Sequence, residues 1–336
     1  MQFFGLEIGD SSIKIVQLKK EPDSLTVLAL GEAASPQPGI SSKSEAQWRE
    51  TAKAIKSLVK ELKLKTKNAV VGLPESEVIS RLIKFPSMKD REVRAALEFE
   101  VETFIPHPLD KIQMDYEIIS RDENGKLLVF VVAALKETVE KYLKVLREAG
   151  VTPIALETPA VALARIFASS DSPVLIVELE GKYSNLIIGK QQNVFLTRSV
   201  PIGTESFVRA ISVSLGLEIS EAEGYCRTYG LKGDELEGKV KQALMPLFER
   251  LIHEVKKVIY AFNEEWRDNV GLLVFSGDGA TIPEFTEETA RILGIETQVA
   301  QPFAQVKLAA PAVIDVQKEG GRFSVALGLA ARGLKS

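Results

Sequence analysis

The sequence predicts an α/β protein with two similar lobes and a small α+β unit inserted into the first lobe. Runs with the two-residue period of β-strands alternate along the chain with runs that have the 3.6-residue period of helices. A group of three strands opens each half, near residues 3–30 and 174–200. Between these groups, residues 77–150 follow the order strand, helix, strand, strand, helix. A repeated plan with one interruption indicates two lobes and an insertion.

Residues 1–76 and 151–170 are predicted to form the first lobe. Its first long helix is indicated by Ile55, Leu58 and Leu62, which recur at helical spacing. The expected elements are strands at 3–8, 13–18, 25–30 and 68–73, a loop at 31–44, a helix at 45–64, a short strand at 151–157 and a helix that ends at 167.

Residues 77–150 are predicted to form the inserted unit. Asn124-Gly125 is a strong signal for a tight hairpin, and Gly150 is placed to end the last helix. The expected elements are strands at 78–85, 115–121 and 126–134 and helices at 90–104 and 137–149.

Residues 171–336 are predicted to form the second lobe, which begins after a polar break at 169–173. Its clearest element is a long helix, in which apolar residues from Leu244 to Phe262 recur at steps of three and four. The expected elements are strands at 174–179, 184–189, 193–200 and 270–275, a helical part at about 205–268 and a terminal helix at 323–334.

Composition and charge exclude several classes of protein. The 336 residues contain 45% hydrophobic and 26% charged residues, which is ordinary for a globular protein. The apolar runs are shorter than the roughly 18 to 20 residues of a membrane span, and no secretory signal precedes the first strand. A net charge of −4 and two histidines argue against nucleic-acid binding and against a zinc or haem site. We expect a cytoplasmic protein, and its single cysteine, Cys226, fits a reducing compartment.

Several segments carry a resemblance to a known family. The turn at residues 7–14 resembles the first phosphate loop of the actin and sugar-kinase fold, in which two turns grip phosphates through backbone N–H groups. Residues 99–115, 227–230 and 323–333 resemble PilM, the cytoplasmic actin-like component of type IV pilus assembly. The insertion matches in position the SHS2 subdomain that PilM shares with the division protein FtsA, although the terminal membrane-binding helix of FtsA is not expected here. The resemblance implies a two-lobed actin-like (ribonuclease-H-like) fold.

The resemblance also implies a site for ATP and Mg²⁺ between the lobes. Lys14 would face the phosphates, and Glu7 and Glu178 would lie behind the ligands of a nucleotide-bound cation. The implied nucleotide-binding residues are Gly9, Asp10, Ser11, Ser12, Lys14, Glu180, Gly181, Ser184, Glu223, Gly277, Asp278 and Gly279.

Three positions depart from the family pattern. Glu180 and Asp278 stand where glycines are usual, and Cys226 stands where the nucleoside-binding lysine is usual. A carboxylate about 4 Å from a phosphate costs on the order of 4 kcal/mol at an effective dielectric constant near 20. We therefore expect a degenerate ATP site without hydrolysis. Glu157 is the one candidate for orienting a water, and the alternative is that it is an acid favoured by the dipole of the following helix.

By resemblance, the protein is expected to be a scaffold that lies against the inner membrane through its partners. It would bind the N-terminal cytoplasmic tail of PilN and connect other pilus alignment proteins to the motor ATPases. Residues of the expected docking region, which could equally form the core of the insertion, are Phe85, Pro86, Phe99, Phe104 and Ile105. The alternatives are an active actin-like ATPase or small-molecule kinase that uses Lys14 and Glu157, a filament-forming protein, and the cytoplasmic component of a related type II secretion system.

Overall fold

The first sheet has six strands and lies between two layers of helices. The computed structural model describes residues 1–22, 24–309 and 315–334. The sheet has the order β14-β3-β2-β1-β4-β8. β1 is antiparallel to β2 and parallel to β4, and all five residues of β1 are buried because both faces of the sheet are covered. The strands are β1 (Phe4–Ile8), β2 (Ser12–Glu21), β3 (Ser24–Ala34), β4 (Asn68–Gly72), β8 (Thr152–Glu157) and β14 (Val306–Leu308).

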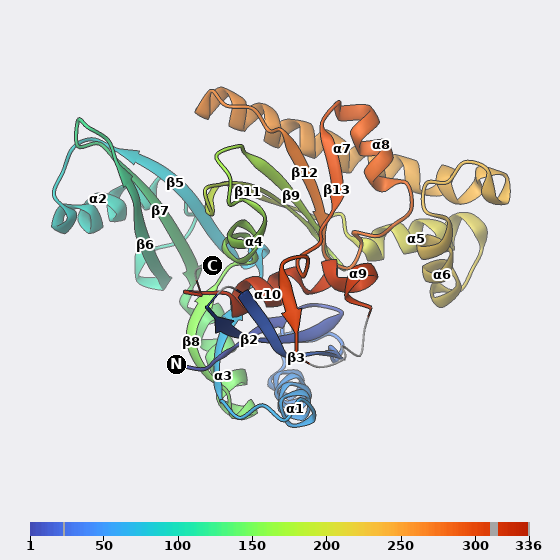
Figure 1. The fold of residues 1–336 in the computed structure, drawn as a ribbon, viewed down its shortest axis with the longest axis horizontal. Helices are drawn as coiled ribbons and strands as arrows, with labels where there is room; N and C mark the ends of the chain where they lie inside the picture. Colours follow the sequence, from blue (N-terminus) through green and yellow to red (C-terminus); the bar gives the residue numbers. More distant parts are fainter. Residues whose placement is uncertain (23, 310–314, 335–336) are drawn as a thin grey trace.

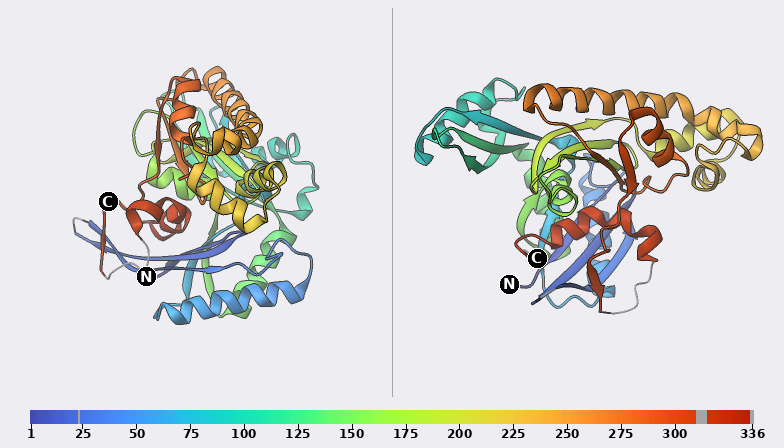
Figure 2. Two further views of the ribbon diagram at one scale, coloured as in Figure 1. Left: turned by 90° about the vertical axis from the view of Figure 1, so that its right-hand side faces the viewer. Right: turned by 45° about the horizontal axis from the view of Figure 1, so that its top comes forward.

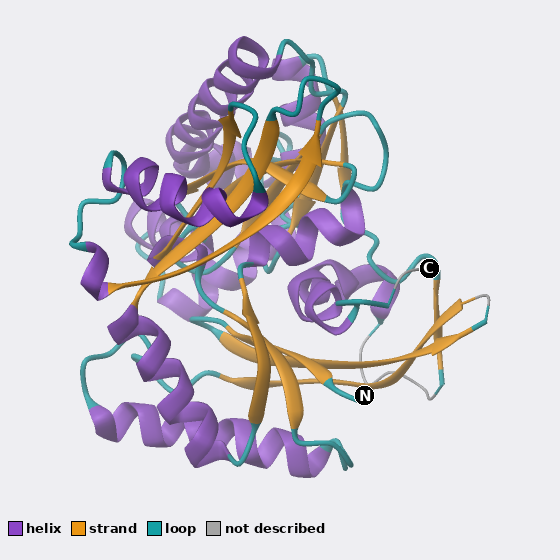
Figure 3. Cartoon of the chain, turned by 90° about the vertical axis from the view of Figure 1, so that its left-hand side faces the viewer, coloured by secondary structure: helices purple, strands orange, loops and turns teal. Residues whose placement is uncertain are grey.

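Four helices cover the two faces of this sheet. α1 (Glu45–Glu61) and α3 (Lys136–Ala149) pack together on the outer face through a core that includes Ile55 and Val145. α4 (Pro159–Phe167) and α10 (Ser324–Ala330) lie on the inner face, between this sheet and the next (Figure 2). Figure 3 shows the two large sheets as separate layers of the molecule.

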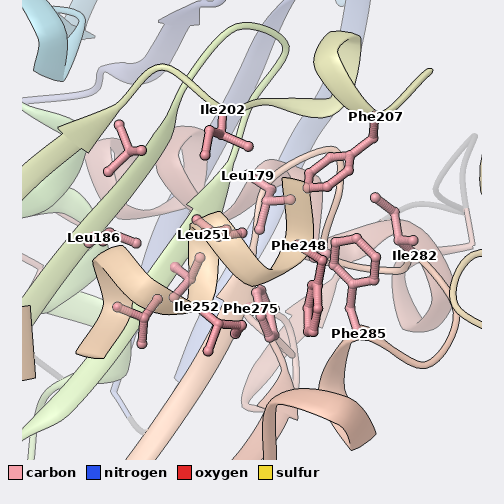
Figure 4. Packing of buried hydrophobic residues seen from close by; sticks show 14 of the residues in the cluster. Leu179, Leu186, Ile202, Phe207, Phe248, Leu251, Ile252, Phe275, Ile282 and Phe285 are labelled. Atoms are coloured by element: carbon pink, nitrogen blue, oxygen red, sulfur yellow. The ribbon is translucent and has the colours of Figure 1, made fainter. Parts of the chain in front are cut away.

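The second sheet has five strands in the order β11-β10-β9-β12-β13. α4 packs on its inner face, and a core of aliphatic side chains and phenylalanine rings fills the space between its outer face and the helices there (Figure 4). The ring centroid of Phe285 lies 5.2 Å from that of Phe207 and 4.9 Å from that of Phe248. The elements are β9 (Val174–Leu179), β10 (Ser184–Lys190), β11 (Asn193–Val200), β12 (Leu272–Ser276), β13 (Glu296–Val299), α5 (Thr204–Leu215), α6 (Ile219–Tyr229), α7 (Lys239–Trp266) and α8 (Phe285–Leu293).

The insertion is a three-stranded antiparallel sheet that projects to one side (Figure 1). Its strands, in the order β5-β7-β6, are β5 (Val78–Phe85), β6 (Ile112–Arg121) and β7 (Leu127–Leu135). α2 (Asp90–Glu102) covers one face with Val93, Leu97 and Val101. The insertion also contacts the second lobe, because the ammonium of Lys84 lies 3.8 Å from the ring centroid of Trp266.

The α/β fold class predicted from the sequence is confirmed, and four details differ. α3, which was expected in the insertion, packs with α1 against the first sheet. β3 runs on to Ala34, into the expected loop at 31–44, because it stays paired with β2 up to Ser12. The terminal helix, expected at 323–334, is shorter, because it ends at Ala330 and turns follow at 331–333. β14 pairs with β3 and α10 packs on β1, so the last part of the expected second lobe, 171–336, completes the first sheet.

Among the described residues, no helix is long and apolar enough to cross a membrane. Besides α10, the chain after β13 includes one short helix, α9 (Val316–Glu319).

Candidate functional site

Two hairpin turns, one from each large sheet, face each other between the lobes. The β1–β2 turn contains Asp10, and the β9–β10 turn contains Lys182, whose Nζ lies 3.1 Å from Oδ1 of Asp10. The carbonyls of Glu180 and Gly181 accept hydrogen bonds, each 2.9 Å long, from the first backbone N–H groups of α5. The β9–β10 turn is therefore held by α5 of its own lobe, and the ion pair joins it to the β1–β2 turn.

Lys14 extends from β2 into the contact between the lobes, and its side chain is fully buried. Its Nζ lies 3.2 Å from Oε1 of Glu7 and 3.1 Å from Oδ1 of Asp278. Burial opposes the charge of Lys14, but the two carboxylates outweigh that effect and raise the pKa of the lysine. The expected phosphate-facing cation is thus already paired with carboxylates of the protein.

Asp278 lies in the loop after β12 and forms a second ion pair, with Arg322. Nε of Arg322 lies 3.3 Å from Oδ1 of Asp278, and NH2 of Arg322 lies 2.9 Å from Glu32 in β3. Burial raises the pKa of Asp278, but Lys14 and Arg322 outweigh this and lower it. Asp278 and Arg322 therefore connect the second lobe, the C-terminal segment and the first sheet through charge.

Glu180 occupies the space between the first turn and the loop after β12. A Cβ atom added to Gly277 would lie 2.9 Å from Oε1 of Glu180, and one added to Gly9 would lie 3.8 Å from Oε2. Gly277 has a φ of +82°, which L-residues with side chains rarely adopt. Burial raises the pKa of the Glu180 carboxyl. The carboxylate of Glu180 therefore lies beside the backbone of both Gly9 and Gly277.

A first cavity of about 670 Å³ lies on one side of these groups. Cys226 is buried there, and burial raises the pKa of its thiol to about 12. Glu223 pairs with Arg227 at 2.8 Å. Residues of the wall include Ser11, Ser12, Thr204, Arg209, Glu223, Cys226, Gly277, Asp278, Gly279 and Arg322. The cavity thus collects the expected nucleoside-side residues and the loop after β12.

A second cavity of about 400 Å³ lies on the other side and is rich in carboxylates. Glu178 is buried in its wall and accepts a hydrogen bond of 2.7 Å from Nδ2 of Asn185. Burial, reinforced by the nearby Glu7 and Glu75, raises the pKa of Glu178 to about 8. Residues of the wall include Glu7, Gly9, Asp10, Glu75, Glu77, Tyr142, Glu178, Glu180 and Lys182.

Sequence reasoning missed Glu75 and Tyr142 as site residues. Glu75 follows β4, a strand parallel to the adjacent β1, and ligands in such sheets bind beyond the carboxyl ends of the strands. That signal was present in the sequence. Tyr142 comes from α3, and its place in the helix indicated only a core position.

Glu157 and Ser184 are not directed into either cavity. Arg165 forms two hydrogen bonds of 2.9 Å with the carboxylate of Glu157, and Arg332 forms a further ion pair with it. The hydroxyl of Ser184 donates to the carbonyl of Ile202. The structure therefore does not bring Glu157 together with the two turns, where it could orient a water.

The expected docking residues divide into buried and exposed groups. Phe85 and Ile105 belong to the core of the insertion, and Phe104 packs beside that core under the guanidinium of Arg81. Pro86 is exposed, and 81% of Phe99 is exposed. Among the five, Pro86 and Phe99 are thus the exposed residues.

The described residues contain no group of three or more His, Cys, Asp or Glu side chains placed to hold a metal ion. Glu7 and Glu178 interact electrostatically, and each also has a partner in the protein, Lys14 for Glu7 and Asn185 for Glu178.

Two lobes with facing hairpin turns and a third loop beside them define an actin-like protein. Comparison supports this class: the fold is similar to MreB5 of Spiroplasma citri bound to AMPPNP, with a TM-score of 0.55 and 12% identity over 97% of this chain and 94% of that one. The chain belongs to the family of the type IV pilus assembly protein PilM, whose model matches residues 5–334.

Two further relatives agree with this family. A solved PilM-PilN type IV pilus biogenesis complex contains a chain with a TM-score of 0.86 and 26% identity, and the match covers 100% of this chain and 99% of that one. The cell division protein FtsA of Bacillus subtilis is 21% identical over 89% of this chain and 78% of its own length.

Proposed function

We propose that this chain is a cytoplasmic scaffold of the type IV pilus alignment complex and binds the N-terminal cytoplasmic tail of PilN. Through PilN it would lie against the inner membrane and connect other alignment proteins to the motor ATPases. Family membership and the likeness to a chain of a PilM-PilN complex support this proposal. The exposed Phe99 and Pro86 on the insertion are the surface residues of the expected docking region.

We further propose that the ATP site is degenerate and does not support hydrolysis. The observation that carries this part is the contact of 3.1 Å between Nζ of Lys14 and Asp278, since a carboxylate holds the cation that phosphate would need. Glu180 fills the adjacent space, and Glu157 is held by two arginines. These residues do not fit Mg²⁺-ATP, so we derive no step that involves it. The same contacts count against the alternative of an active ATPase or kinase.

Calorimetric titration with Mg²⁺-ATP tests the degenerate site. We expect no binding to the wild type and measurable binding to the Asp278→Gly, Glu180→Gly double variant. In that variant the ammonium of Lys14 is released from Asp278, and the space that the Glu180 side chain occupies is open to phosphate. Adding Lys14→Met to the double variant is the control and should abolish the gain. Micromolar binding by the wild type would show that the proposal is wrong.

A peptide with the sequence of the cytoplasmic tail of PilN from the same organism tests the partner. We expect it to bind the wild type and to bind Phe99→Ala at least threefold more weakly. Phe99 presents a large exposed ring that is not packed in the hydrophobic core, so its loss should affect binding more than folding. Tyr260→Ala is the matched control, since Tyr260 is a 69% exposed aromatic residue on α7. Absence of binding to the wild type would overturn the PilN part of the proposal.

A further inference from the structure

The carboxylates of the second cavity are not balanced by the cations of the protein. Asp10, Glu77 and Glu7 each form an ion pair, with Lys182, Lys141 and Lys14 respectively. Within the described part of the chain, Glu75, Glu178 and Glu180 form no ion pair with a lysine or arginine. Glu75 and Glu178 are 5% and 2% exposed. Burial raises the pKa of all three carboxyl groups, so they hold their protons more tightly than exposed acids do, and a cation bound beside them would favour their charged form.

Glu178 accepts a hydrogen bond from Asn185, and Glu75 accepts one from the backbone N–H of Ala160. Two other polar groups in the same wall lack hydrogen-bond partners. Tyr142 is fully buried, and within the described residues its hydroxyl has no hydrogen-bond partner. Oε2 of Glu7, a residue that is 7% exposed, also has none. Natural proteins rarely leave buried polar atoms unsatisfied, so such atoms at a cavity point to a missing ligand.

The wall also contains apolar residues, beside the polar Ser41, Ser76 and Asn185 and the ion-paired Lys182. Glu178 and Glu75 lie deep, while the partly exposed Tyr183 stands at the rim. The apolar wall residues are Ile8, Ile40, Leu73, Pro74, Pro159 and Val325. A volume of about 400 Å³, apolar sides and a few buried polar groups are typical of a small-ligand pocket. Apolar sides suit an aliphatic chain, and the carboxylates suit a cationic end.

We propose that the second cavity binds a guanidinium or ammonium group carried on an aliphatic chain. The cation lies against Glu178 and Glu75, and the chain lies along the apolar wall. A guanidinium matches paired carboxylate oxygens through its fixed fork of N–H donors. The ligand is either a free small cation or an arginine or lysine side chain of another protein. The inference does not depend on PilN, but it rests on the proposed degeneracy of the ATP site, because the two sites share Glu7, Glu178 and Glu180.

Titration of the whole protein with n-butylguanidinium and with N-butylurea tests the proposal. The two probes have nearly the same shape, and only the first is charged. We expect n-butylguanidinium to bind at least tenfold more tightly, and to raise the unfolding temperature as its concentration rises. Equal binding of the two probes, or binding of neither, would overturn the proposal without any variant.

Variants locate the site. Glu178→Gln and Glu75→Gln should each weaken n-butylguanidinium at least tenfold, and Tyr142→Phe should weaken it by a smaller factor. Glu319→Gln is the control, because Glu319 lines the first cavity. If Glu178→Gln does not fold, Glu75→Gln and Tyr142→Phe serve in its place. Unchanged affinity in the variants that fold would place the cation elsewhere and overturn the proposal.

Two short peptides distinguish a free small cation from a side chain of another protein as the ligand. They are acetyl-Gly-Arg-Gly-amide and its citrulline counterpart, which is neutral and nearly isosteric. Tighter binding of the arginine peptide than of n-butylguanidinium would identify a protein side chain as the ligand. Binding of n-butylguanidinium with exclusion of the peptide would identify a free small cation. Both results support the proposal.

Discussion

At the scale of single residues, burial decides what the carboxyl of Glu178 does. Its surroundings raise its pKa to about 8, well above the value near 4.5 of an exposed glutamate. Between these two values the folded chain holds a proton that the unfolded chain has released. The free energy of unfolding must therefore fall as pH rises through this range. Glu178 therefore lowers the free energy of unfolding most at alkaline pH, where its buried side chain must ionise.

Glu178→Gln removes this titration and nearly preserves the shape of the side chain. Relative to the wild type, we expect the variant to become more stable between pH 5 and pH 8.5, by on the order of a few kcal/mol. Urea unfolding followed by tryptophan fluorescence at several pH values measures the difference. Glu123→Gln, in the exposed β6–β7 turn, is the control. Parallel pH curves for Glu178→Gln and the wild type would contradict the prediction.

At the scale of elements, α10 depends on close backbone contact. All seven of its residues are buried between α4 and β1. A Cβ atom on Gly328 would lie 2.2 Å from the carbonyl oxygen of Ala162 in α4, and one on Gly5 would lie 2.1 Å from the carbonyl oxygen of Ala326. These glycines are required for the distance at which the elements pack, since their φ values are not in the left-handed region.

Gly328→Ala should lower the free energy of unfolding by about 1–3 kcal/mol, because helix α10 or α4 must shift to make room. Gly224→Ala is the matched control, since Gly224 lies in α6 with no atom within 4 Å of an added Cβ. That substitution should stabilise the protein by roughly 0.5–1 kcal/mol through helix propensity. Thermal and urea unfolding compare the two variants. Equal effects would show that α10 and α4 can move apart at Gly328 at little cost in free energy.

At the scale of the whole molecule, charged side chains join the lobes across the cleft. Lys14 with Asp278, Asp10 with Lys182, and Glu32 with Arg322 make three such connections. Lys14 with Asp278 is the most buried of these contacts, so salt screens it less than it screens the partly exposed pair of Asp10 and Lys182. The side chains of the protein thus hold the two turns together.

Arg322→Gln removes one connection and leaves Asp278 with one cation. We expect backbone amides in the β1–β2 turn and in the loop after β12 to exchange hydrogen at least threefold faster, because the lobes separate more often. Hydrogen exchange with mass spectrometry measures the rates. Arg267→Gln, at the exposed end of α7, is the control and should leave them unchanged. Unchanged rates in Arg322→Gln would mean that apolar packing alone holds the lobes.

Much of the fold was open to prediction because it depends on local order. The period of apolar residues, the Asn124-Gly125 turn and the end of α3 at Gly150 identified most strands and helices. α8, β13 and β14 were not predicted, because they are short and β14 pairs with β3, which lies far from it in the sequence. For the site, the turn residues and the unusual Glu180 and Asp278 were recognisable from sequence.

By itself the sequence determined the α/β class, the repeated lobes, the insertion and the family resemblance, since each follows from patterns along the chain. Only the tertiary structure decided that Asp278 pairs with Lys14 and that Arg332 reaches Glu157. It also decided that Tyr142 meets Glu178 at one cavity. These pairs join residues far apart in sequence, and their energies depend on distance and burial, which no local pattern encodes.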